Sequence, residues 1–267
     1  MIKHFKAFEF RVSRENLAGP CSAGWQQFLS SFANRPSGNV HPRRCLPALA
    51  LFLLLLLVGL PAQAANYTFQ GLNIPLGCTG GNGNFTCVAL ILGVGDTISI
   101  SSPTTITVIG ALTTGASSRI NATGSSSLNL VVNGLTTLGA STMVKANLSS
   151  TAGVITIGER NSFTGTIKTA TAAINVGAGS TITGPISTTI TGAVTIGANA
   201  VVNGNISTAT GVVTIGADTV VNGNVSTVVG AVTTGAGSSV TGSVVTQVGA
   251  ITIAGNVGGK INSLDGS

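Results

Sequence analysis

Residues 193–211 read AVTIGANAVVNGNISTATG, and residues 212–230 repeat them as VVTIGADTVVNGNVSTVVG. Within the first line, Val194 and Ile196 flank Thr195, which is the period-2 pattern of a β-strand. The line contains no 3.6-residue helical period, and β-branched residues dominate it. Strands this short are not stable alone. We therefore predict that the chain coils and that equivalent pieces stack as parallel strands.

The repeat runs through the chain from residue 135 to its end, in successive lines of about 19 residues. It predicts an all-β fold, a single-stranded parallel β-helix (β-solenoid). Each coil must turn several corners, and a corner with positive φ suits glycine. Two glycine columns are expected to mark such corners: Gly158, Gly177, Gly197, Gly216 and Gly235 in the first, and Gly165, Gly184, Gly204, Gly223 and Gly242 in the second.

The same alignment predicts which side chains face inward. The expected interior set is Val194, Ile196, Val202, Ile206, Val213, Ile215, Val221 and Val225. The alternate positions face outward, so a threonine column is expected at Thr195, Thr214, Thr233 and Thr252. Asn203 and Asn222 are expected to form a ladder of stacked amides.

Towards the N-terminus the coils become less regular. Residues 96–110 and 111–134 read as coils of less regular length, with a loop at 124–127. We assign 93–267 to the solenoid, about nine coils stacked roughly 4.8 Å apart. Residues 65–92 are expected to cap its first coil.

Cys78 and Cys87 are the only cysteines after residue 64, and a flexible, Gly-rich segment separates them. We predict a disulfide between them, since an exported chain meets an oxidising compartment. A metal site would need further ligands, and no histidine follows His41 to supply one.

Residues 40–64 resemble a secretory signal peptide: Arg43 and Arg44 precede an apolar run of about fifteen residues and a small-residue end. Ala62 and Ala64 suit a signal peptidase, which predicts a mature start near Ala65. The alternative is a transmembrane anchor, but the run is shorter than the roughly 20 residues of a bilayer span. Residues 1–39 are an N-terminal extension, either a product of start-site choice or part of an extended signal.

Charge is concentrated in the part predicted to be removed. Residues 1–64 hold seven of the 12 Lys and Arg residues and two of the six acids, so the remainder carries about +1. A charge-rich disordered chain is excluded by a hydrophobic share of 43% and a charged share of 7%. The five basic residues after Ala64 are scattered, and we expect no nucleic-acid partner.

Few side chains of the types that usually act in catalysis follow Ala64. The acids are Asp96, Glu159, Asp218 and Asp265. Arg160 and Asp218 share a repeat column but lie three coils apart, about 14 Å, which is beyond hydrogen-bond reach. Glu159 and Arg160 are neighbours, and we interpret them as a solvent-exposed pair at a corner. We expect no enzyme: no catalytic, cofactor-binding or metal-binding residue and no cofactor.

Lines of the form VTIGA-x-x-x-V-x-G-x-[IV]-x-T resemble the polymer-forming β-helical repeats of bactofilins. The opening from Tyr67 to Cys78, then Phe85-Thr86-Cys87, then Gly95-Asp96-Thr97-Ile98, is similar to the solenoid region of pilus-biogenesis-type proteins of the mannose-sensitive haemagglutinin system. The chain departs from bactofilins in its export signal, and from the pilus-type proteins in lacking their large downstream domains. Neither resemblance transfers a catalytic residue.

Two functions are compatible with these features. The first is a secreted structural or cell-surface β-solenoid that pairs end to end with itself or with surface components, in the periplasm, on the cell surface or outside the cell. The alternative is a binding module or adhesin for a glycan, a pilus partner or an ice surface. No membrane span is expected in the chain after Ala64.

Overall fold

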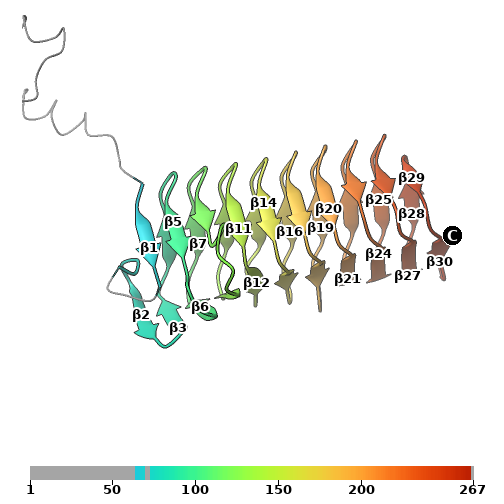
Figure 1. Cartoon of the computed structure of the whole chain (residues 1–267). Coiled ribbons are helices and arrows are strands. Elements are labelled where there is room, and N and C mark those ends of the chain that lie inside the picture. The colour runs from blue at the N-terminus through green and yellow to red at the C-terminus, as the bar shows by residue number, and fades with distance from the viewer. Residues whose placement is uncertain (1–63, 70–72, 266–267) are drawn as a thin grey trace, which may run out of the picture. The chain divides into compact units, whose positions relative to one another are not determined.

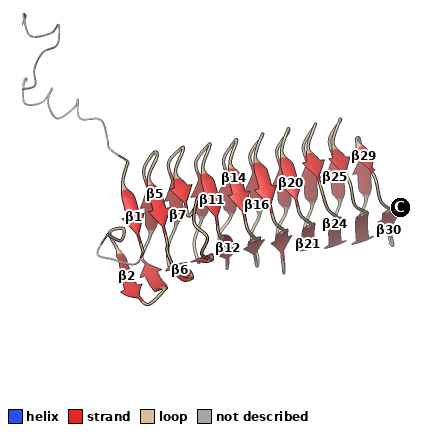
Figure 2. Cartoon of the chain, viewed as in Figure 1, coloured by secondary structure: helices blue, strands red, loops and turns tan. Residues whose placement is uncertain are grey.

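The computed structural model describes residues 64–69 and 73–265, which form a β-solenoid of parallel stacked coils (Figure 1). Every regular element in these residues is a strand (Figure 2). The predicted all-β class is therefore confirmed. The predicted extension 1–39 and the predicted signal peptide, apart from Ala64, lie outside the described residues.

Three sheets run along the stack, and each coil contributes one short strand to each sheet. Sheet A contains β1 (Asn66–Thr68), β5 (Thr97–Ser99), β8 (Arg119–Ile120), β11 (Met143–Lys145), β14 (Ser162–Thr164), β17 (Thr181–Thr183), β20 (Val201–Asn203), β23 (Val220–Val221), β26 (Ser239–Val240) and β29 (Asn256–Val257). Sheet B contains β2 (Cys78–Gly81), β3 (Asn84–Cys87), β6 (Thr104–Val108), β9 (Leu128–Val132), β12 (Asn147–Ser150), β15 (Ile167–Thr169), β18 (Ile186–Thr188), β21 (Ile206–Thr210), β24 (Val225–Val229), β27 (Val244–Val248) and β30 (Ile261–Ser263). Sheet C contains β4 (Leu90–Leu92), β7 (Leu112–Thr114), β10 (Thr136–Leu138), β13 (Ile155–Ile157), β16 (Ile174–Val176), β19 (Val194–Ile196), β22 (Val213–Ile215), β25 (Val232–Thr234) and β28 (Ile251–Ile253).

The register follows the sequence repeat. In sheet C, Val194 pairs with Val213 and Val213 with Val232, 19 residues per coil. Two upstream coils are longer, since Leu90 pairs with Leu112 and Leu112 with Thr136. The extra residues of the second form a loop at 121–127 that contains the predicted loop. The repeat alignment therefore correctly predicted which residues meet wherever the coil length is constant.

The core is a narrow aliphatic column inside the three sheets. All eight residues predicted to face inward are buried, with exposed fractions of 0–1%. Burying a Val or Ile side chain contributes roughly 1.5–3 kcal/mol. The predicted asparagine ladder is also present, since Asn222 Nδ2 donates to Asn203 Oδ1 at 2.7 Å.

The first glycine column has a different cause from the one predicted. Its members do not have positive φ; that conformation falls two residues later, at Arg160, Asn199 and Asp218 for example. A Cβ on Gly177 would lie 2.5 Å from the carbonyl carbon of Gly158 in the preceding coil. Close approach of stacked backbones, not a left-handed corner, therefore requires glycine here. In the second column, Gly165 and Gly184 have positive φ as predicted, whereas Gly204, Gly223 and Gly242 do not and are instead required by close approach of the preceding coil.

At the N-terminal end of the stack, a hairpin forms the edge of sheet B. β2 pairs antiparallel with β3, and the predicted Cys78–Cys87 disulfide joins them. Phe69 and Phe85 are buried over the first coil, with an edge-to-face contact of 5.0 Å between ring centroids. The segment 65–92, expected as a cap, also supplies the first parallel-paired strand of each sheet, β1, β3 and β4.

Replacing Gly197 by alanine should test the packing between coils. Its Cβ would lie 2.6 Å from the backbone nitrogen of Ala178, so we expect a loss of about 1–3 kcal/mol in unfolding free energy. Gly81→Ala is the matched control, because no atom lies within 4 Å of the added Cβ. Equal denaturation midpoints for the two variants would contradict the packing argument.

Removing the disulfide by Cys78→Ser with Cys87→Ser should lower the unfolding free energy by about 2–3 kcal/mol, since a short loop is no longer closed in the unfolded chain. The neighbouring cross-strand pair supplies the control, Thr79→Ser with Thr86→Ser. Thermal denaturation monitored by circular dichroism would measure both. An unchanged melting temperature in the cysteine variant would show that the hairpin stabilises the end without its covalent link.

Candidate functional site

The outward face of sheet C carries the predicted threonine column. Thr195 pairs with Thr214, Thr214 with Thr233, and Thr233 with Thr252, one coil apart. All four point away from the core and are exposed or half-buried. The predicted column is therefore confirmed.

The column is longer than the sequence predicted. In register order it consists of Ile91, Thr113, Thr137, Thr156, Asn175, Thr195, Thr214, Thr233 and Thr252. Thr113 was missed because the longer coil breaks the 19-residue alignment, whereas Thr137 and Thr156 lie in regular coils and Asn175 separates them from the predicted four. The sequence did carry a signal for these threonines, because each lies two residues before a glycine, as in Thr113-Thr114-Gly115 and Thr137-Leu138-Gly139.

The residues beside this column are uncharged, and most of them are alanine or glycine. Two positions before each member stand Ala89, Ala111, Leu135, Val154, Ala173, Ala193, Val212, Ala231 and Ala250. Two positions after each threonine from 113 to 233 stands a glycine of the first column or its upstream equivalent. Sheet C therefore presents hydroxyls and methyl groups in a regular array, with uncharged side chains at all of these positions.

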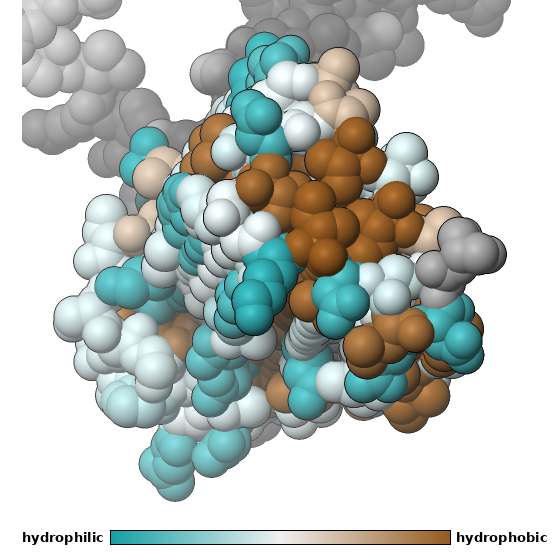
Figure 3. All heavy atoms as spheres, turned by 90° about the vertical axis from the view of Figure 1, so that its right-hand side faces the viewer, coloured by the Kyte–Doolittle hydropathy of each residue, from teal (hydrophilic) through white to brown (hydrophobic). Residues whose placement is uncertain are grey.

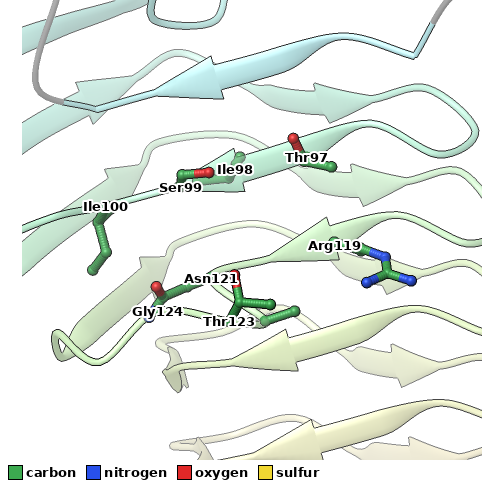
Figure 4. Close-up of a pocket in the computed structure, with 9 residues that line it drawn as sticks. Thr97, Ile98, Ser99, Ile100, Arg119, Asn121, Thr123 and Gly124 are labelled. Atoms are coloured by element: carbon green, nitrogen blue, oxygen red, sulfur yellow. The ribbon is translucent and has the colours of Figure 1, made fainter.

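Sheet A carries a small polar pocket of about 240 Å³ where the long coil interrupts the stack (Figure 4). β5, the end of β8 and the 121–127 loop line it, and Arg119 is exposed beside it. Four hydrogen bonds hold the loop: Asn121 Nδ2 donates to the carbonyls of Ser126 and Lys145, Ser126 Oγ to Ser101 O, and Lys145 Nζ to Gly124 O. The pocket is thus bounded by an anchored loop and one guanidinium.

The Glu159–Arg160 corner is a surface feature. Both residues are exposed, and Arg160 has positive φ. Arg160 and Asp218 do occupy the same corner position of different coils, because each lies two residues after a first-column glycine. The structure gives these residues no shared pocket and no ion pair among the described residues.

The C-terminal end of the stack differs from its sides. β28, β29 and β30 each have a strand neighbour on one side only. Ile251, Ile253 and Val257 are only partly buried there, and Ile261 is 55% exposed. Figure 3, which looks onto this end, shows apolar side chains gathered near its centre.

No family model, curated protein or solved structure matches this chain. Within the described residues, no helix is long and apolar enough to cross a membrane. The same residues contain no group of three His, Cys, Asp or Glu side chains that could hold a metal ion.

Proposed function

We propose that this chain is an exported structural β-solenoid that associates end to end with a second copy. It acts in the periplasm, on the cell surface or outside the cell, and the proposal includes no catalytic activity. The observation that carries it is the open C-terminal end. Signal-like residues 40–64 support the exported location.

The C-terminal end offers a second copy both unpaired strand edges and apolar side chains. Three strands present free hydrogen-bonding edges, which pair readily with another chain. Val232 in the preceding coil is fully buried, whereas its register partner Ile251 is only half-buried, since β28 has no further described strand beside it. Contact between two such ends would bury these side chains and satisfy the edges. At the N-terminal end, Phe69 and Phe85 are buried, and the hairpin forms the edge of sheet B.

Sedimentation of the exported product over a range of concentrations tests this association. We expect a species of twice the monomer mass that Ile261→Lys abolishes, because a charge at this end must be desolvated on pairing. Ile190→Lys is the matched control, since Ile190 is 57% exposed on the side of the stack. A strictly monomeric wild-type protein at high concentration would contradict self-association, and electron microscopy would show whether longer rods form.

The threonine column of sheet C favours a second candidate, a module that binds an ordered, uncharged surface such as ice. Stacked strands place successive threonines about 4.8 Å apart, and the adjacent positions are uncharged. A rigid array of hydroxyls and methyl groups complements a periodic surface of water better than it complements a charged ligand. A neutral glycan surface is the other member of this class.

Thr195→Lys with Thr214→Lys tests the second candidate. The wild-type protein should inhibit ice recrystallisation, and this variant should lose the inhibition because two charged chains interrupt the array. Ser207→Lys with Ser226→Lys makes the same change on the outward face of sheet B and should keep it. A glycan array run in parallel would identify a carbohydrate instead. Inactivity of the wild-type protein in both assays would exclude this function.

A further inference from the structure

One buried column turns the corner between sheets C and A. Its members lie three residues after each glycine of the first column and its upstream equivalents: Asp96, Ser118, Thr142, Asn161, Ser180, Ala200, Thr219 and Ser238. In the later coils the side chain donates a hydrogen bond to a glycine carbonyl. Ser118 Oγ donates to Gly93 O at 2.8 Å, and Thr219 Oγ1 to Gly197 O at 2.8 Å. The column therefore satisfies corner carbonyls with neutral donors, Ala200 excepted.

Asp96 is the exception at the first position. It is the only carboxylate in the column, and its side chain accepts two backbone hydrogen bonds and donates none. Its two partners are the backbone nitrogens of Ala65 and Gly93, each at 2.7 Å. Asp96 is 8% exposed, and the described residues give its carboxylate no ammonium or guanidinium partner. A buried negative charge with only neutral donors is incompletely compensated.

The nitrogen that faces Asp96 belongs to the residue predicted to begin the processed chain. Ala65 follows Ala62-Gln63-Ala64, the small-x-small end of the signal-like segment. Ala65 is also held through its carbonyl, which accepts from Thr97 N at 2.8 Å. Hydrolysis of the Ala64–Ala65 bond would leave this same nitrogen as an α-ammonium at neutral pH.

We infer that Asp96 is a built-in receptor for the amino terminus released by processing at Ala64–Ala65. Water, with a signal peptidase as catalyst, cleaves the bond; Ala64 leaves as a carboxylate, and the Ala65 nitrogen takes up protons to become an ammonium. The neutral hydrogen bond to Asp96 then becomes a charge-assisted one, which is roughly twice as strong. This inference rests on the proposed export.

The consequence is that processing holds the first strand more strongly than its backbone pairing alone. β1 lies at the edge of sheet A and pairs with β5 alone. An ion pair at Ala65 anchors that strand and the first coil beneath the hairpin. The position is specific, since one extra residue would move the ammonium by about 3.4 Å along the chain.

The test compares two exported products, one beginning at Ala65 and one beginning a residue earlier, with and without Asp96→Asn. With Asp96, we expect the unfolding equilibrium constant at pH 6 to be about ten-fold smaller for the Ala65 form, as for hydrogen bonds to charged groups. Asparagine still accepts from Gly93 but carries no charge, so the difference between the two forms should vanish. Asp218→Asn, at an exposed corner, should leave the difference unchanged.

Equal stability of the two forms with Asp96 present, or an equal difference with asparagine, would overturn the inference. Mass measurement of the natural product must also give Ala65 as its first residue, and any other start would overturn the processing site. These outcomes are separate from the proposed function. Cell fractionation tests export itself, and sedimentation tests association, neither of which depends on Asp96.

Discussion

Every part of this structure depends on backbone pairing between successive coils. The three sheets are parallel, and the hydrogen bonds continue through the corners, for instance from Gly177 N to Ile157 O at 2.7 Å. Corners stacked this closely have no room for a side chain pointing along the axis. The glycine columns follow from that constraint, as do the short strands and the narrow core.

The same stacking determines how polar groups are accommodated. Buried hydroxyls line the inner corners and donate to glycine carbonyls, as Thr208 and Thr227 both do to Gly211. Each such side chain satisfies a carbonyl that the sheets leave free. At the ends of the stack this arrangement cannot continue. The first coil therefore uses an acidic side chain and a hairpin, whereas the last described coil leaves its apolar residues partly exposed.

These features separate the interior from the functional surfaces. The core is mainly aliphatic, with Phe69, Phe85 and Phe163 towards the N-terminal coils, and it positions the outward side chains. What varies is the face of sheet C, the pocket beside Arg119 and the two ends. Structural and binding roles both use a rigid stack, and they differ in which of these surfaces meets a partner.

The sequence by itself determined the solenoid, the inward residues and the C-terminal part of the threonine column, because a constant 19-residue period translates directly into register. It also determined the disulfide, because only two cysteines follow Ala64. Only the tertiary structure determined which residues pair where the coil length departs from 19. It aligned Thr113 and Thr137 across a longer coil, and showed that close approach makes the first-column glycines necessary. It also brought Ala65 to Asp96, since a contact across 31 residues depends on coil length and not on local pattern.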